Sequence, residues 1–227
     1  MALPHLDAQL RAIEGPHAVL IPLRSLTQGK HRLDSVLDAG QRAALIQLMA
    51  NRVVSAAHEL PVLIVHDDPD VAEWAAGRNA ASLRPNSPGL NNAVAAGRDL
   101  LAAHGVERVI IAHADLPGAI DLRPMLTNEL ISIAPDRHGE GTNVLCLPTA
   151  LPFDFAYGPG SFARHCAQAR AMGIEPRIVD APDLALDLDH PDDVHSFAAT
   201  TSYAANASLP TNDSFAAFAH FLDEESR

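Results

Sequence analysis

Asp115 stands where an apolar strand should end. The stretch VIIAHADLP at 109–117 begins as a short run of apolar, partly β-branched residues, which is typical of a strand buried on both faces, and it ends in a carboxylate followed by Leu-Pro. Open α/β sheets bind ligands just beyond the carboxyl ends of their strands, and a carboxylate there suits Mg²⁺. A single Asp after a strand also fits a simple turn cap, so a metal site requires further acids.

Two further acids, Asp187 and Asp189, lie in the stretch DLALDLDHPDDV at 183–194. Because they are two residues apart, an extended backbone directs both carboxylates to the same side. Asp192 and Asp193 follow Pro191 and are better explained as acids at a helix N-terminus, where they complement the helix dipole. Capping also competes for Asp187 and Asp189, but two acids on one side exceed what a cap needs. With Asp115 they predict a Mg²⁺ site.

Three cations, Arg24, Lys30 and Arg32, gather in the polar segment RSLTQGKHRLDSVL at 24–37, directly after an expected first strand. Lys30 is the one lysine in a chain whose Lys and Arg together number 16, and it is a compact charge of the kind that phosphates attract. A triphosphate site is one interpretation and a solvated surface loop is the other. A Walker loop is excluded, because its G-x-x-x-x-G-K-[ST] pattern is absent.

Two glycine-containing segments favour a backbone that approaches an anion closely. PDRHGEGTN spans 135–143, and Gly158, Gly160 and Ser161 precede a helix expected at 162–172. Free backbone N–H groups and the Ser161 hydroxyl at that helix N-terminus would form an anion site. Ser161 as a plain N-cap is the alternative.

The elements that must position these residues alternate between strand and helix. Strands are expected at 18–23, 61–65, 80–83, from 109 onward, and at 130–134, 143–147 and 175–180. Helices are expected at 40–58, between Asp68 and Gly77, at 90–104, irregularly at 121–128, and at 162–172. Asp38 and Gln41 make a capping-box signature for the first helix. The alternation predicts an α/β fold with a mostly parallel sheet and helices on both faces.

Composition bounds the class of protein. The 227 residues carry a formal charge of −12, which argues against a general nucleic-acid binder, and the two cysteines indicate no disulfide framework. The 12 histidines form no zinc-ligand pattern. No apolar run is long enough to span a membrane and no signal peptide is apparent, so a cytoplasmic protein is expected. We expect an N-terminal arm at 1–15, a domain at 16–199, and a linker with a short C-terminal helix at 200–227.

Six motifs resemble the 2-phospho-L-lactate guanylyltransferase family. They are IPLRSLTQGKHRL at 21–33, LNNAV at 90–94, HADLP at 113–117, APDRHGEGTN at 134–143, FAYGPGSFARH at 155–165 and LALDLDHPDD at 184–193. The first motif departs from the family pattern, with Arg24 and Ser25 where Lys-Pro is common and Gly29 where Ala is common. The resemblance implies a nucleotidyltransferase fold of the glycosyltransferase-A (nucleotide-diphospho-sugar transferase) type and a role in the biosynthesis of the deazaflavin coenzyme F(420).

Members of this family join GTP to a small phosphorylated acid and release pyrophosphate. The acid is 2-phospho-L-lactate, phosphoenolpyruvate or 3-phospho-D-glycerate, according to the branch. Carried onto this chain, the resemblance implies a Mg²⁺-dependent enzyme with its functional residues in four sets. Mg²⁺ is held by Asp115, Asp187 and Asp189, and the triphosphate is bound by Lys30 with Arg24 and Arg32. The nucleobase is bordered by Leu90 and Asn91, and the acceptor is bound by Thr142, Gly158 and Ser161. The expected catalytic residues are Lys30, Arg32 and Asp115.

Two alternative functions are consistent with the same residues. In the first, the chain is a nucleotidyltransferase of this fold that acts on another phosphorylated acceptor, since fold does not fix function. In the second, it is a non-catalytic nucleotide-binding regulator. The three acids and Lys30 speak against the regulator. Assembly into a homo-oligomer, contact with the next enzyme of the pathway, and the identity of the acid stay open at this stage.

Overall fold

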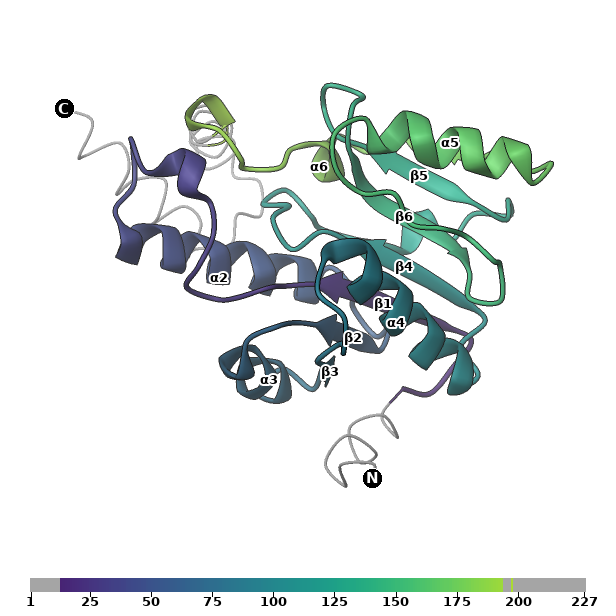
Figure 1. The fold of residues 1–227 in the computed structure, drawn as a ribbon, viewed down its shortest axis with the longest axis horizontal. Helices are drawn as coiled ribbons and strands as arrows, with labels where there is room; N and C mark the ends of the chain where they lie inside the picture. The colour runs from purple at the N-terminus through teal and green to yellow at the C-terminus, as the bar shows by residue number, and fades with distance from the viewer. Residues whose placement is uncertain (1–12, 194–196, 198–227) are drawn as a thin grey trace.

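A seven-stranded sheet forms the centre of the molecule (Figure 1). The computed structural model describes residues 13–193 and 197. The strand order is β3-β2-β1-β4-β6-β5-β7. The strands are β1 (His17–Pro22), β2 (Val62–Val65), β3 (Ala81–Leu83), β4 (Arg108–Ala112), β5 (Ser132–Pro135), β6 (Thr142–Pro148) and β7 (Arg177–Ile178). The helices are η1 (His31–Leu33), α2 (Ala39–Ser55), α3 (Pro69–Ala76), α4 (Leu90–Ala103), η2 (Arg123–Met125), α5 (Ser161–Ala171) and α6 (Pro182–Ala185).

The sheet is mostly parallel, as predicted, with one reversal. β1 pairs in parallel with β2 and β4, β2 with β3, and β5 with β7, whereas β6 runs antiparallel to both β4 and β5. The reversal follows from the loop at 136–141, which is too short for the crossover that parallel neighbours need. As a consequence, β6 begins at the edge where β1 and β4 end.

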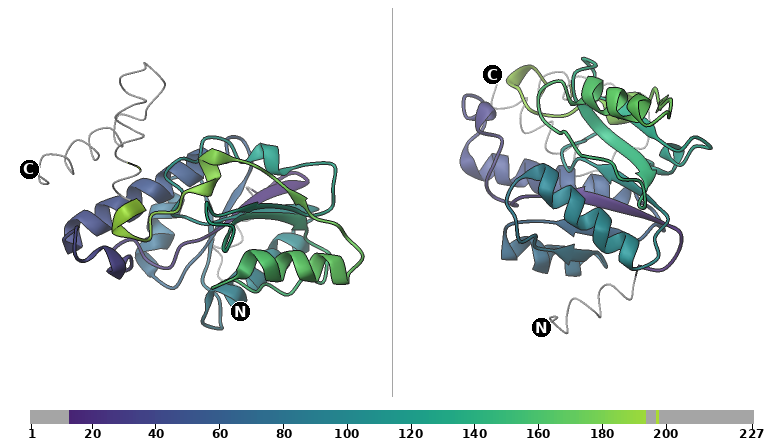
Figure 2. Two further views of the ribbon diagram at one scale, coloured as in Figure 1. Left: turned by 90° about the horizontal axis from the view of Figure 1, so that it is seen from above. Right: turned by 45° about the vertical axis from the view of Figure 1, so that its right-hand side comes forward.

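Helices cover both faces of the sheet (Figure 2), which confirms the second part of the fold prediction. In β1, Val19 and Ile21 face a core shared with α2 and α3, while Ala18 and Leu20 face a core shared with α4 and α5. A strand with both faces buried is continuously apolar, which is why the sequence reads as an unbroken run. Among the described helices, none has the length and apolarity needed to cross a membrane.

Local sequence signals placed most element ends correctly. Asp38 and Gln41 form the reciprocal capping box of α2, with Gln41 N donating to Asp38 Oδ1 at 2.8 Å. Asp68 caps α3, which ends at Gly77. Two predicted elements are shorter in the structure. The helix expected at 121–128 is the single 3-10 turn η2, and the strand expected at 175–180 is the two-residue β7 with exposed side chains.

The predicted terminal segments lie largely outside the described residues. Of the arm expected at 1–15, the structure describes residues 13–15, where Ile13 is buried against the α4 side of the core. The linker and short helix expected at 200–227 are outside the described part of the chain altogether.

Candidate active site

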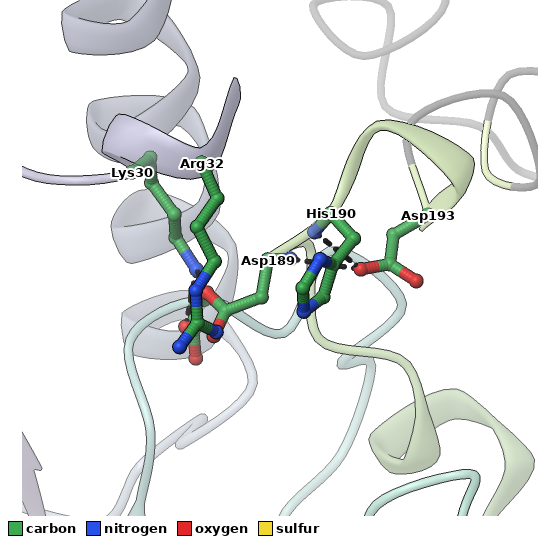
Figure 3. A network of polar contacts seen from close by, with 6 residues as sticks. Lys30, Arg32, Asp189, His190 and Asp193 are labelled. Atoms are coloured by element: carbon green, nitrogen blue, oxygen red, sulfur yellow. Dashed lines mark hydrogen bonds and ion pairs between the residues drawn. The ribbon is translucent and has the colours of Figure 1, made fainter. Parts of the chain in front are cut away.

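Lys30 joins acidic side chains from two distant parts of the chain, and Figure 3 shows its side chain directed toward Asp189. Its Nζ donates to Asp115 Oδ2 at 2.5 Å and to Asp189 Oδ1 at 2.6 Å, and its side chain is 10% exposed. Burial alone would lower the pKa of Lys30, but the charges of Asp115 and Asp189 raise it above its usual value. The ammonium group is therefore charged and holds two carboxylates that are far apart in the sequence.

Backbone contacts bring the segment containing Asp187 and Asp189 beside Asp115. Leu188 N donates to the Asp115 carbonyl at 3.4 Å, and Asn143 Nδ2 donates to the carbonyls of Leu184 and Ala185 at 2.9 and 3.1 Å. Asn143 stands near the start of β6, and its own carbonyl accepts from His113 N at 3.0 Å. The antiparallel β6 thus joins the end of β4 to the acidic segment.

The structure places the three predicted metal ligands around one another without forming a metal cage. Among the described residues, no three His, Cys, Asp or Glu side chains are grouped so that they could hold a metal ion, and Lys30 lies between Asp115 and Asp189. Burial, followed by the charges of Asp115 and Asp189, raises the pKa of Asp187 to about 6. Asp115 Oδ1 is buried without a hydrogen-bond partner. Three mutually repelling carboxylates and an unpaired oxygen fit an added cation, so the magnesium assignment stays a prediction that this geometry suits.

A continuous row of three hollows surrounds Lys30. The first, here called the Lys30 hollow, encloses about 210 Å³ between the 23–30 loop, α2 and Asp115. The second, the β1–β2 hollow, encloses about 440 Å³ and shares Arg24 and Leu90 with the first. The third, the β6–α5 hollow, encloses about 410 Å³ and shares His113 and Asp115 with the first. The Lys30 hollow thus adjoins a largely apolar space on one side and a polar one on the other.

The two predicted arginines flank Lys30 on opposite sides. Arg24 lines the Lys30 and β1–β2 hollows; its side chain is 86% exposed, and its Nε lies 3.9 Å from Asp67 Oδ2. Arg32 lines the β6–α5 hollow, and its Nη1 lies 3.5 Å from Asp189 Oδ2 (Figure 3). The three cations are close in sequence but do not share one hollow.

Leu90 and Asn91, predicted to border the nucleobase, differ in their surroundings. Leu90 lines both the Lys30 and the β1–β2 hollows. Asn91 Oδ1 accepts a hydrogen bond from Tyr157 N at 2.8 Å, which joins α4 to the segment before α5. Leu90 therefore lines two hollows, and the side-chain oxygen of Asn91 already has a structural partner; that either residue borders the nucleobase stays a prediction.

Thr142, Gly158 and Ser161, predicted to bind the acceptor, all line the β6–α5 hollow. Ser161 Oγ accepts from Thr142 N at 3.0 Å, which fixes the start of β6 against the start of α5. His165 Nε2 accepts from Ala156 N at 3.0 Å, so its Nδ1 carries the proton that bonds Thr142 Oγ1 at 3.0 Å. The Thr142 hydroxyl hydrogen then remains available to a ligand.

The helix N-terminus beside this hollow differs from its prediction in two ways. Gly160, in a left-handed conformation with φ 70°, is the N-cap, and Ser161 is the first helical residue. The N–H groups of Ser161 and Phe162, expected to be free for an anion, donate to the carbonyls of Gly158 and Glu140 at 3.0 and 3.1 Å. The 139–141 backbone, distant in sequence, satisfies Phe162 N, whereas Gly158 satisfies Ser161 N within the turn that precedes α5.

Asp193 is a site residue that sequence analysis assigned only to a helix dipole. Its Oδ2 accepts from Asp189 N at 3.0 Å and from His190 N at 2.6 Å (Figure 3), and its Oδ1 accepts from Arg137 Nη2. The residue is 4% exposed. An acid three residues after the cap position, with Pro191 at the first position, is a capping-box signal that would have indicated the contact with His190 N.

The chain is similar in sequence to a family of known proteins. The model of the family described as "Guanylyl transferase CofC like" matches residues 17–201. A phosphoenolpyruvate guanylyltransferase from Sphaerobacter thermophilus is 35% identical over 83% of this chain and 95% of its own length. One from Rubrobacter xylanophilus is 39% identical over 77% of this chain and 90% of its own length.

Solved structures show the same fold at low sequence identity. A protein from Desulfovibrio desulfuricans G20 described as a "putative nucleotide-diphospho-sugar transferase" superposes with a TM-score of 0.69 at 14% identity, covering 93% of this chain and 96% of its own. A CMP:2-keto-3-deoxy-manno-octonic acid synthetase complexed with CTP gives 0.54 at 12% identity, covering 83% and 99%. These similarities establish the nucleotidyltransferase type of fold that the sequence motifs implied.

Proposed function

The chain belongs to the CofC-like guanylyl transferase family, and on that premise we propose that it joins GTP to phosphoenolpyruvate with release of pyrophosphate, in the biosynthesis of coenzyme F(420). Phosphoenolpyruvate is chosen among the three acids because the curated relatives at 35% and 39% identity are named for it. The observation that carries the proposal is that the Lys30 hollow adjoins two hollows of different character, one largely apolar and one polar.

The two substrates fit the two sides of Lys30. Arg24 and Leu90 line the side proposed for GTP, with the triphosphate beside Lys30. Thr142, Ser161 and Arg32 line the side proposed for the acceptor, whose phosphate and carboxylate require donors and positive charge. His113 and Asp115 are common to the Lys30 and acceptor hollows, so the reacting phosphates would meet beside them.

The reaction needs alignment and charge neutralisation rather than a general base. The acceptor phosphate, with a second pKa near about 6, is largely dianionic at neutral pH and is already a nucleophile. One of its oxygens forms a bond to the α-phosphorus of GTP, the bond from that phosphorus to the bridging oxygen breaks, and pyrophosphate leaves with the electron pair. The chain must hold the two anions in line and offset their charge, which is the role proposed for Lys30, Arg24 and Arg32.

Mg²⁺ would be held by Asp115, Asp187 and Asp189 in this proposal. The unpaired Asp115 Oδ1 supports the assignment, as does the pKa of Asp187, which burial and then the charges of Asp115 and Asp189 raise. When bound, Mg²⁺ would supply a Lewis acid that offsets the negative charge of the nucleotide phosphates. Without added positive charge, these carboxylates would repel both substrates.

The test is pyrophosphate release from GTP and Mg²⁺ with each of the three acids offered separately. A coupled assay with the next enzyme of the pathway should run alongside, because products of this class are labile. Turnover with phosphoenolpyruvate alone supports the proposal as written, and turnover with another of the acids replaces the acceptor. Binding of GTP without turnover with any acid would refute guanylyl transfer to these substrates.

A further inference from the structure

The β1–β2 hollow has the character of a nucleobase site with a carboxylate and a guanidinium group at its rim. Its described lining is mostly apolar residues, together with the side chains of Asp67, Arg24 and His66. The lining residues are Pro22, Leu23, Arg24, Val65, His66, Asp67, Pro88, Gly89, Leu90 and Ala93. Flat apolar walls suit the faces of a purine, and a few placed polar groups select its edge.

The position of this hollow follows from the proposed function. Because the triphosphate is assigned beside Lys30, the nucleoside must extend into a space that adjoins the Lys30 hollow. The β6–α5 hollow, on the other side, is assigned to the acceptor. The β1–β2 hollow shares Pro22, Leu23, Arg24 and Leu90 with the Lys30 hollow and remains for the base.

Asp67 is the member of an acidic pair whose oxygens accept no hydrogen bond within the described residues. Its neighbour Asp68 accepts hydrogen bonds from Ser25 Oγ at 2.7 Å and from Asp70 N at 3.0 Å, so Asp68 fixes the 23–30 loop to the start of α3. Asp67 has a side chain that is 54% exposed, and Arg24 Nε is 3.9 Å from its Oδ2. That distance is too long for a hydrogen bond, so both oxygens of Asp67 can accept from a ligand.

We propose that the carboxylate of Asp67 selects guanine by accepting hydrogen bonds from its N1–H and its 2-amino group. Guanine presents these two donors side by side, and a carboxylate presents two acceptors in a matching plane. Adenine has an acceptor at N1 and no 2-amino group, so it would place a lone pair against the carboxylate. This selection rests on the proposed function, because it assumes that the nucleotide extends from Lys30 into the β1–β2 hollow.

A different role for Asp67 makes a different prediction. If Asp67 only orients Arg24 toward the triphosphate, its replacement will weaken every nucleoside triphosphate alike. If Asp67 contacts the base, its replacement will change which base is preferred. Base preference therefore separates the two roles, even though both lower activity with GTP.

The test is Asp67→Asn in the full chain, assayed with GTP and with xanthosine triphosphate (XTP). Xanthine has an N1–H donor beside a 2-oxo acceptor, and an amide offers one acceptor and one donor, so the variant complements xanthine. We expect kcat/KM to fall for GTP and to rise for XTP, each by about tenfold or more, which reverses the preference of the wild type. Asp70→Asn, the same exchange at an exposed position outside the hollow, should leave the preference for GTP unchanged.

Calorimetric binding of both nucleotides with Mg²⁺ provides a readout that does not need turnover. A reversed binding preference in Asp67→Asn supports the proposal even if the variant is slow. Equal losses for both nucleotides, unchanged preference, or a folded variant that binds neither would each overturn it. If the wild type binds GTP but transfers it to none of the three acids, guanylyl transfer fails while the base preference can still be measured.

Discussion

Replacing Asp193 by Asn should show whether the turn at 189–190 must be held for the site to work. The side chain of Asp193 is 6% exposed and joins Asp189 N, His190 N and Arg137 Nη2. An amide has the same shape and can keep one set of acceptor contacts, but its NH₂ group then faces a donor. The change therefore removes one charge-assisted hydrogen bond and leaves the rest of the fold in place.

The cost is set by the surroundings of the pair. A hydrogen bond to a charged group contributes about 1.5 to 3 kcal/mol, and breaking a fully buried pair costs about 3 to 5 kcal/mol. Because the Arg137 side chain is 32% exposed, we expect the lower range, about 2 kcal/mol. For a chain of this size, that lowers the melting temperature by roughly 4 to 8 °C.

The reaction rate should fall more than the stability does, because a displacement of the 189–190 turn also displaces Asp189. A displacement of about 1 Å at a reacting centre costs about a hundredfold in rate. Pyrophosphate release, measured over a range of Mg²⁺ concentrations, should need about tenfold more Mg²⁺ in Asp193→Asn and stay slower at saturation. GTP binding without metal should change little, because Arg24 and Leu90 lie away from the turn.

Arg137→Met completes a double-mutant cycle on the same contact. Both single variants should lose stability, and the double variant should lose clearly less than the two losses added. Additive losses, or wild-type Mg²⁺ dependence in a folded Asp193→Asn, would refute the positioning of Asp189 through Asp193.

Three further predictions concern single residues. Asp115→Asn should abolish Mg²⁺-dependent turnover and leave the circular-dichroism spectrum unchanged, and wild-type activity in the folded variant would remove the metal site from this account. Lys30→Met leaves the neighbouring carboxylates without their ammonium partner, so Mg²⁺ should raise the melting temperature of the variant by more than that of the wild type; equal shifts would contradict this. Burial lowers the pKa of His165 from its ordinary 6.5 to about 4, so the folded state loses stability as the pH falls from 6.5 to 4, by up to about 3 kcal/mol. His165→Gln should remove most of that pH-dependent loss. Urea titrations at pH 7 and pH 5 give the difference in the free energy of unfolding, and an equal difference in the wild type and the variant would refute the prediction.

Sequence reasoning recovered the frame of the molecule where local signals decide it. The capping box of Asp38 and the apolar run of β1 are properties of a few adjacent residues, and both fixed their elements correctly. The reversal of β6 depends on a short loop and on pairing between distant strands, which periodicity does not encode. The short length of β7 was also not predictable from local sequence, because it depends on how far β5 continues beside it.

The site divides in the same way between local and distant causes. Residue types and spacing singled out Asp115, Asp189 and Lys30 for chemistry, and the fold brings these three into contact. The separation of Arg24 from Arg32 was not foreseeable, because the turn η1 sends them to different hollows. The partner of the Asn91 side chain lies 66 residues further along the chain and has no local signal.

The charge at the centre of the site bears on the order of events. Three carboxylates lie beside Lys30, and Arg32 lies 3.5 Å from Asp189, so these groups together carry one excess negative charge when all three acids are ionised. One divalent cation more than offsets that excess. Mg²⁺ would then compete with Lys30 for Asp115 and Asp189, and an arriving triphosphate would offer Lys30 new oxygens as it brings the metal. The acceptor, itself an anion, would meet a favourable field only after this exchange.

The structure therefore predicts that Mg²⁺ and GTP bind before the phosphorylated acid, and acceptor binding in calorimetry should be weak until both are present. Equally tight acceptor binding to the metal-free chain would show that Lys30 and Arg32 neutralise the site unaided.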